Sequence, residues 1–259
     1  MTDSPVAIVT GGAQGLGAAI CIELLKKGYR VCAVDIQGEK AEEFAKQQQL
    51  VYGKESITAS HCDVSKESDY IRVFEETIKT FKRVDVLINN AGILLESNPR
   101  KTIDVNLMGP IYGCYTAFKY MGKSNGGNGG VVINTSSLAG FLPAAENPVY
   151  AVSKHGIIGL TRSFGLPLHF DKDGIIFACV APHMIDTDIL KSVNKTLVPD
   201  YDISKVHSHI LMRPEFVAKG YMKILEDKIN GSVLTVIPGE YRYIEAQKEV
   251  TELLKRNNI

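Results

Sequence analysis

A tyrosine and a lysine stand four residues apart in the stretch NPVYAVSKHG, directly behind a proline. A helix that begins near Pro148 places Tyr150 and Lys154 one turn apart on the same face. A lysine ammonium beside a phenol favours the phenolate, so a group that ordinarily titrates near pH ~10 becomes a base closer to neutrality. Oxidation of an alcohol needs such a base. The alternative is a surface Tyr/Lys pair, because many helices contain this spacing.

Two serines stand before this helix, at the end of the β-rich run VVINTSS. A strand that ends in Ser136 and Ser137 just before the helix can place a hydroxyl beside the phenol of Tyr150. The combination favours proton chemistry over the surface pair.

A glycine-rich turn, TGGAQGLG, joins an apolar strand to a helix over residues 10–17. Three glycines have separate reasons to be there: Gly11 for a tight turn, Gly15 for close approach of a diphosphate, and Gly17 for packing of the helix on the strand. The N-terminus of the following helix offers N–H groups to a phosphate. A glycine cluster alone also occurs in other sharp turns between a strand and a helix.

Asp35 ends the next strand, which strengthens the case for a dinucleotide site. Its carboxylate can accept hydrogen bonds from both ribose hydroxyls and would repel a 2′-phosphate. Ile36 supplies no cation for such a phosphate. These two residues favour NAD over NADP, and the alternative for Asp35 is a helix cap or a loop residue.

Strand-like and helix-like segments alternate along the chain and must position these groups. The strand-like runs cover residues 6–10, 29–35, 57–64, 84–92, 131–137 and 231–237, and the helix-like runs cover 18–28, 38–49, 66–81 and 102–121. This alternation predicts an α/β fold: a doubly wound parallel sheet of about seven strands with helices on both faces. The short connections predict one domain over residues 1–259.

Composition excludes several kinds of partner. The chain has 259 residues, 45% of them hydrophobic, and 29 basic residues balance 29 acidic ones. No net charge attracts nucleic acid or an anionic membrane, so we expect a small molecule or another protein as partner. Five scattered cysteines without CxxC spacing suit reduced thiols and not metal ligands. No leader or long apolar span is visible, which predicts a cytoplasmic protein without a membrane segment.

Five motifs in order carry a family resemblance: TGGAQGLG, NNAG at residues 89–92, Asn106, Ser137 and YAVSK at residues 150–154. From Val6 to about Ile237 the chain resembles the short-chain dehydrogenase/reductase family. Within it the chain most resembles the NAD-dependent branch that oxidises hydroxyprostaglandins, and it is more distantly similar to insect-type alcohol dehydrogenases. The resemblance implies a Rossmann fold and oxidation of a secondary alcohol.

The resemblance also implies a role for each catalytic residue. Tyr150 is the general base that takes the hydroxyl proton, and Lys154 lowers the pKa of Tyr150 and holds the nicotinamide ribose. Ser137 hydrogen-bonds the substrate oxygen; the adjacent Ser136 is a rival, but the register with Tyr150 favours Ser137. Asn106 fixes a water that links Lys154 to solvent.

The cofactor residues follow from the same resemblance. Asp63 and Val64 bracket the adenine, Asn90 lines the ribose pocket and Thr187 binds the carboxamide. The full predicted NAD set is Gly11, Gln14, Gly15, Leu16, Gly17, Asp35, Ile36, Asp63, Val64, Asn90, Tyr150, Lys154, Ile185 and Thr187.

Three residues depart from the family pattern. His183 follows Pro182 where the family has glycine, and a histidine tolerates positive φ less well. Pro167 interrupts a helix that the family keeps regular. Asn147 replaces a glutamine that contacts substrate in the hydroxyprostaglandin branch, so it predicts an altered substrate.

Two further segments are predicted around the site. Residues 185–214 read as an apolar lid, with ordinary helix packing as the alternative, and His207 and His209 lack a nearby acidic third ligand, so we expect no metal. Residues 239–259 form a C-terminal extension whose amphipathic end contacts a second subunit. In this family the helices after Thr102 and Pro148 pair subunits, which implies a homodimer.

Two functions remain as hypotheses. The favoured one is an NAD-dependent dehydrogenase that acts on a hydrophobic secondary alcohol, such as a hydroxy fatty acid, a prostaglandin-like lipid, a steroid or a terpenoid, with small alcohols as the other substrate class. The second is an NAD-binding protein with little turnover, acting as a binding or regulatory module.

Overall fold

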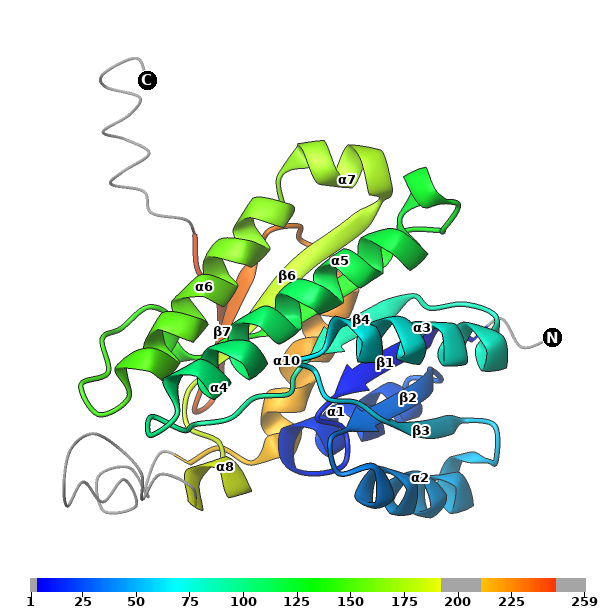
Figure 1. Cartoon of the computed structure of the whole chain (residues 1–259), viewed down its shortest axis with the longest axis horizontal. Coiled ribbons are helices and arrows are strands. Elements are labelled where there is room, and N and C mark those ends of the chain that lie inside the picture. The colour runs from blue at the N-terminus through cyan, green and yellow to red at the C-terminus, as the bar shows by residue number, and fades with distance from the viewer. Residues whose placement is uncertain (1–3, 192–210, 246–259) are drawn as a thin grey trace.

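The computed structural model describes residues 4–191 and 211–245, which form one twisted sheet between two layers of helices (Figure 1). The strand order is β3-β2-β1-β4-β5-β6-β7-β8. The strands are β1 (Val6–Thr10), β2 (Arg30–Asp35), β3 (Ile57–His61), β4 (Val86–Asn89), β5 (Gly130–Thr135), β6 (Ile175–Pro182), β7 (Val233–Ile237) and β8 (Glu240–Tyr243). The predicted Rossmann-like α/β architecture is confirmed.

The sheet is parallel except at one edge. Neighbouring strands from β3 to β7 pair in parallel, whereas β8 pairs antiparallel with β7. All five residues of β1 are buried, as expected for a central strand with helices on both faces. The sheet therefore has one strand more than the seven expected, because the start of the predicted C-terminal extension adds β8.

Helices cover both faces of this sheet (Figure 1). They are α1 (Gly15–Lys26), α2 (Gly38–Tyr52), α3 (Glu67–Phe81), α4 (Pro99–Ile103), α5 (Gly109–Met121), α6 (Pro148–Phe164), α7 (Pro167–Asp173), α8 (Asp188–Lys191) and α10 (Pro214–Asp227). Apolar residues of α1, α2 and α10 form one buried cluster with the sheet, and those of α3 and α5 form another on the opposite face. Packing on both faces holds the strands in place, and the residues at their carboxyl ends form the site described below.

Pro167 starts a separate helix. Helix α6 ends at Phe164, and α7 begins at Pro167, which occupies a first-turn position that needs no N–H donor. At the break, a Cβ on Gly165 would lie 2.2 Å from the Cα of Gly231, so the chain requires glycine there. Pro167 therefore does not distort the helix that carries Tyr150.

Several sequence-based expectations concern residues outside these ranges. Most of the predicted lid and the amphipathic C-terminal end lie there, including His207 and His209. All five cysteines are buried and none forms a disulfide. None of the helices formed by residues 4–191 and 211–245 combines the length and apolar content that a membrane span requires.

Candidate active site

A cleft of about 600 Å³ opens at the carboxyl ends of the parallel strands. It is lined by residues that follow each of the strands β1 to β6. Strands β2 and β3 are added on one side of β1, and β4 to β7 are added on its other side. The order in which strands join the sheet therefore switches sides between β1 and β4, although the two strands are parallel. In open α/β sheets this switch is where nucleotides bind.

The glycine-rich turn forms the first wall of the cleft. Gly11 and Gly15 have φ of 63° and 52°, a region that favours glycine. A Cβ on Gly17 would lie 1.9 Å from the carbonyl oxygen of Gly11, so no side chain fits there. Asn90 holds the turn from the neighbouring strand, because its Nδ2 donates to the Thr10 carbonyl at 2.9 Å.

The glycine-rich turn of residues 10–17, here called the glycine-rich cradle, leads into α1. The N-terminus of α1 has no capping side chain. Gln14 at the N-cap makes no capping hydrogen bond, and the first turn of α1 contains no acidic residue. Uncapped N–H groups and the positive end of the helix dipole suit a diphosphate. The turn and α1 therefore fit the diphosphate of a dinucleotide.

Asp35 lies at the end of β2 and is 6% exposed. Its Oδ1 accepts from the backbone N–H of Gln37 at 3.0 Å, and its Oδ2 accepts from that of Ala13 at 3.2 Å. These two bonds fix the carboxylate at the wall of the cleft. Ile36 beside it is 59% exposed and offers an apolar surface. This pair fits an adenosine ribose that carries no 2′-phosphate.

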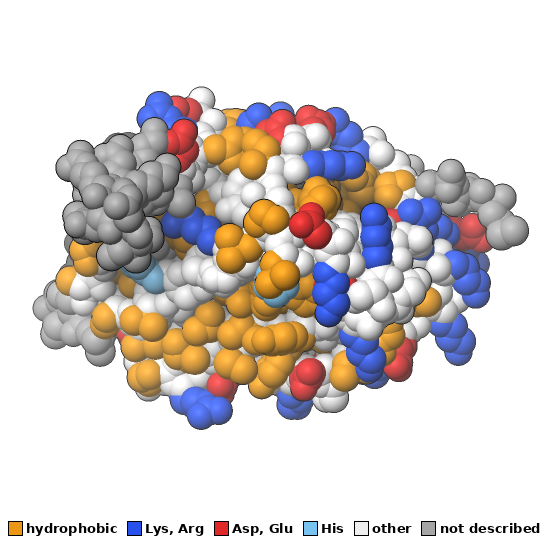
Figure 2. Space-filling model, turned by 90° about the horizontal axis from the view of Figure 1, so that it is seen from above, with side chains coloured by type: hydrophobic (Ala, Val, Ile, Leu, Met, Phe, Trp, Pro, Cys, Tyr) orange, Lys and Arg blue, Asp and Glu red, His pale blue; other side chains and the backbone are white. Residues whose placement is uncertain are grey.

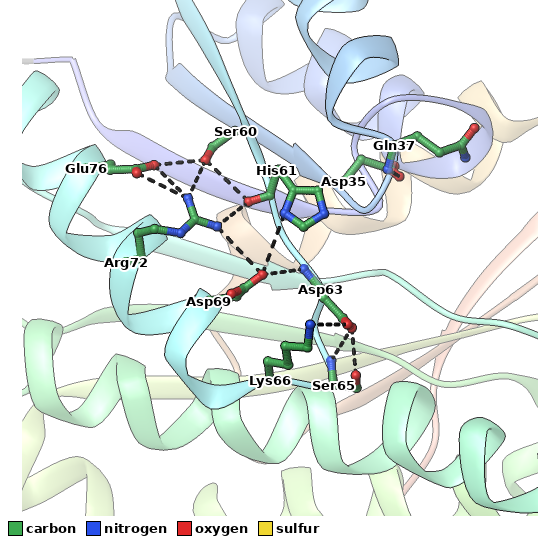
Figure 3. Close-up of polar contacts among 10 residues, drawn as sticks. All are labelled: Asp35, Gln37, Ser60, His61, Asp63, Ser65, Lys66, Asp69, Arg72 and Glu76. Atoms are coloured by element: carbon green, nitrogen blue, oxygen red, sulfur yellow. Dashed lines mark hydrogen bonds and ion pairs between the residues drawn. The ribbon is translucent and has the colours of Figure 1, made fainter.

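The turn after β3 is held by a network of polar contacts that the sequence did not predict (Figure 3). Asp69 accepts the backbone N–H of Asp63 at 2.8 Å, and Arg72 donates to the carbonyl of His61 at 2.6 Å. Arg72 also lies 3.7 Å from the carboxylate of Asp69. The first two turns of α3 thereby fix Asp63 and Val64 in the wall of the cleft.

Lys154 points from α6 toward the end of β5. It is buried, and its Nζ donates to the carbonyl oxygen of Thr135 at 2.9 Å. The same Nζ lies 5.5 Å from the centre of the Tyr150 ring. Burial lowers the pKa of Lys154 to about 8, so its proton is held far less tightly than that of an exposed lysine.

Tyr150 lies beside Ser137 in the cleft. Burial raises the pKa of the phenol above its ordinary value, and a hydrogen bond with Ser137 opposes this rise. The pKa shift of Tyr150 is therefore opposite to the one expected from the sequence, because burial outweighs the hydrogen bond with Ser137. Ser136 has a different partner, since its hydroxyl donates to the Lys154 carbonyl at 2.8 Å.

Asn106 lies in a π-helical turn, η1 (Asp104–Met108), between α4 and α5. Its side chain binds both backbone groups of Ile93 at 2.8 Å, and Nδ2 also approaches the Ser153 hydroxyl at 3.4 Å. A Cβ on Gly92 would lie 3.4 Å from Oδ1 of Asn106 and 3.7 Å from Nζ of Lys154. Asn106 and Lys154 thus share one small region behind the cleft.

Of the site residues predicted from the sequence, all but one line the cleft. All fourteen residues of the predicted NAD set line the cleft, as do Ser137 and Asn147, whereas Asn106 lies behind the lining. Asn147 is 4% exposed, and its Oδ1 has no partner among the described residues. Such a buried acceptor is suited to a donor on a ligand.

His183 lines the cleft without backbone strain. It is not among the residues with positive φ, and its N–H donates to the Val236 carbonyl at 2.8 Å. Its Nδ1 accepts the N–H of Met184 at 2.6 Å. The histidine therefore continues the β6–β7 hydrogen bonding where glycine was expected.

Apart from the cofactor and catalytic residues, the lining of the cleft is largely apolar. Its apolar side chains are Ile93, Leu94, Val105, Leu138, Leu142, Pro143, Met184 and Ile189. Thr187 lies at the boundary between this apolar part and the glycine-rich turn, because a Cβ on Gly15 would meet its methyl group at 3.2 Å. Within the described ranges, no three His, Cys, Asp or Glu side chains gather as metal ligands.

Comparison with known proteins identifies the family. A family model described as short chain dehydrogenase matches residues 5–198. The chain belongs to the short-chain dehydrogenase family. A 15-hydroxyprostaglandin dehydrogenase (NAD(+)) of Bos taurus is 36% identical to this short-chain dehydrogenase over 241 residues, covering 89% of this chain and 90% of the relative.

More distant relatives agree with this assignment. Alcohol dehydrogenase 1 of Ceratitis capitata is 28% identical over 188 residues, covering 71% of this short-chain dehydrogenase and 73% of the relative. The crystal structure of a levodione reductase superposes with a TM-score of 0.79 at 25% identity, covering 91% of this chain and 96% of that one. The predicted resemblance, including its more distant insect branch, is confirmed.

Proposed function

We propose that this short-chain dehydrogenase uses NAD to oxidise a secondary hydroxyl group of a hydrophobic substrate to the ketone. The observation that carries the proposal is the grouping of Ser137, Tyr150 and Lys154 in one cleft with the glycine-rich cradle. This arrangement combines a proton acceptor, a hydroxyl donor and a cation next to a surface that fits a diphosphate.

The side chains divide the chemistry between them. Tyr150 takes the hydroxyl proton of the substrate, and Ser137 donates a hydrogen bond to the same oxygen and holds the carbinol in place. NAD, when bound, supplies the acceptor for the hydride. Lys154 provides positive charge beside the phenol, and Asn106 holds a water that links Lys154 to solvent.

The preference for NAD rests on Asp35 and Ile36. The fixed carboxylate of Asp35 accepts ribose hydroxyls and repels a 2′-phosphate, and the exposed side chain of Ile36 cannot neutralise such a phosphate. We therefore expect dissociation constants that favour NAD over NADP by at least about tenfold. Comparable affinities for the two cofactors would contradict this role of Asp35.

The substrate class follows from the apolar part of the cleft lining. Its apolar lining favours a lipid-like or bulky alcohol over a small one. The relative from Bos taurus is named for a 15-hydroxyprostaglandin, which is an alcohol of that kind. Asn147 has a shorter amide than the glutamine of the hydroxyprostaglandin branch, so its unpartnered oxygen selects a donor in a different position.

A panel of alcohols with NAD tests the proposal. It contains a 15-hydroxyprostaglandin, a secondary hydroxy fatty acid, a hydroxysteroid, a terpenoid alcohol and 2-propanol, and NADH formation is measured by absorbance. We expect the lipid-like alcohols to give the highest kcat/KM. Turnover of 2-propanol alone would favour the insect-type substrate class, whereas NAD binding without turnover would favour a binding or regulatory module.

We also infer a cytoplasmic homodimer that pairs through α5 and α6. Exposed apolar side chains on these helices support this pairing, because Tyr115 is 57% exposed and Val152 is 61% exposed. Figure 2 views the molecule from the side of α6 and α7, where hydrophobic side chains gather on the surface. A contiguous apolar surface of this kind is typical of subunit interfaces.

A further inference from the structure

Glu96 is a buried carboxylate beside helix α6. Only 3% of the residue is exposed, and it does not line the cleft. Its Oε1 accepts the backbone N–H of Tyr150 at 2.8 Å, and its Oε2 accepts that of Val149 at 3.2 Å. A charged side chain at this depth is rare unless both of its oxygens are engaged, as they are here.

The first turn of α6 depends on Glu96 for its acceptors. The helix begins at Pro148, which has no N–H, and Asn147 at the N-cap forms no capping bond. The N–H groups of Val149 and Tyr150 are the next ones that lack a partner within the helix. Glu96 satisfies both, and its negative charge lies at the positive end of the helix dipole.

The segment immediately before Glu96 is held by two side chains. Asn106 binds the N–H and the carbonyl of Ile93, and the hydroxyl of Thr102 donates to the Leu95 carbonyl at 2.7 Å. Glu96 follows directly, so its position is set by η1 and α4. The same side chain of Asn106 reaches the region of Lys154 behind Gly92.

We propose that Glu96 is a positioning residue for Tyr150. It holds the backbone of Tyr150 through the 2.8 Å bond and thereby sets the position of the phenol relative to Ser137 and the reacting carbinol. The proposal rests on the dehydrogenase function proposed above. Because a displacement of about 1 Å can cost about 10²-fold in rate, the loss of this bond should reduce kcat.

The substitution Glu96→Gln isolates this effect. Glutamine has nearly the same shape but only one acceptor oxygen, and its NH₂ group cannot accept the second N–H. With a 15-hydroxyprostaglandin as probe, we expect kcat to fall about tenfold or more and KM for NAD to change by less than about twofold. Glu96→Ala removes both acceptors and should reduce kcat further.

Glu215→Gln is the matched control. Helix α10 also begins at a proline, Pro214, and Glu215 is an exposed acid in its first turn, outside the cleft lining. We expect wild-type kcat and wild-type KM for NAD in this variant. Thermal unfolding and NADH fluorescence titrations are recorded for all of the proteins.

The outcomes separate this inference from the proposed function. Turnover by the wild-type protein together with wild-type kcat in Glu96→Gln would show that the positioning role is wrong. A parallel loss of kcat, NAD affinity and Tm in Glu96→Gln would also contradict it, because Glu96 would then support folding alone. No turnover by the wild-type protein on any alcohol would refute the proposed function, and this inference with it.

Discussion

At the scale of single residues, burial shifts the pKa values of Tyr150 and Lys154 more than the two side chains shift each other. Burial raises the pKa of the phenol and lowers the pKa of the ammonium, and Lys154 donates to the Thr135 carbonyl. The sequence spacing predicts their proximity and cannot predict this desolvation, which depends on how deeply β5 and α6 bury the pair.

The lowered pKa of Lys154 predicts a pH-dependent stability. In the unfolded chain this pKa returns to about 10.5, whereas it is about 8 in the folded protein. Between these values the unfolded chain binds the proton that folded Lys154 has lost, so the contribution of Lys154 to the free energy of unfolding rises with pH. This rise approaches ~1.4 kcal/mol per pH unit within the window.

Urea unfolding of the NAD-free wild-type protein and of Lys154→Met measures this contribution. The difference between the two free energies of unfolding should stay constant below about pH 7 and should grow in favour of the wild-type protein from about pH 8 to pH 10. A difference that is flat or falls over this window would mean that Lys154 is not desolvated.

At the scale of elements, the connections at the ends of strands determine both halves of the cleft. The link of residues 93–98 after β4 holds α6 through Glu96, and the first turn of α3 holds the turn after β3 through Asp69 (Figure 3). Each carboxylate accepts backbone N–H groups of another segment. The two contacts predict separate kinetic effects, one on kcat and one on cofactor affinity.

The substitution Asp69→Asn tests the cofactor side. It removes the charge that faces Arg72 and weakens the bond to the backbone N–H of Asp63. We expect KM for NAD to rise several-fold, with kcat at saturating NAD unchanged. Glu67→Gln in the same first turn of α3 is the control and should leave both constants unchanged. A lower kcat at an unchanged KM would contradict this assignment.

The sequence predicts most elements because their periodicity is strong. The helix expected over residues 66–81 is α3 (Glu67–Phe81), and the strand expected over 6–10 is β1 (Val6–Thr10). Strands β6 and β8 are not among the expected runs. Periodicity does not distinguish a nearly fully buried apolar run such as β6 from a buried helix, and β8 is a short edge strand that is only partly buried. Periodicity carries no information about such pairing.

Local sequence patterns predict the candidate site less completely than they predict the helices and strands. Glycine spacing and the Tyr150/Lys154 pair indicate which residues share the cleft, but Glu96, Asp69 and the π-helical turn of Asn106 act through contacts between distant segments. An isolated acid in a loop has the same sequence signature whether it is solvated or buried. Three-dimensional packing alone distinguishes the two cases.

At the scale of the whole molecule, the cleft and the proposed subunit interface involve different faces of α6. Tyr150 and Lys154 face the cleft, whereas Val152 is exposed on the outside. Subunit association and the geometry of the cleft would therefore depend on the same helix, α6.

The substitution Val152→Glu tests the interface. A buried charge at the centre of an apolar interface is costly, so we expect a homodimer for the wild-type protein and a monomer for the variant in analytical ultracentrifugation. Leu50→Glu on α2, where the leucine is 90% exposed, is the control and should remain a dimer. A wild-type monomer, or a dimeric Val152→Glu variant, would refute pairing through this face.

The proton-accepting role of Tyr150 is the central claim, and Tyr150→Phe tests it most directly. The substitution removes one oxygen atom and leaves the ring and the glycine-rich cradle in place. NADH formation from a 15-hydroxyprostaglandin is measured for both proteins, together with NADH binding by fluorescence. We expect kcat to fall by about 10³-fold or more with NADH affinity within about twofold of wild type. Wild-type turnover in the phenylalanine variant would contradict the account.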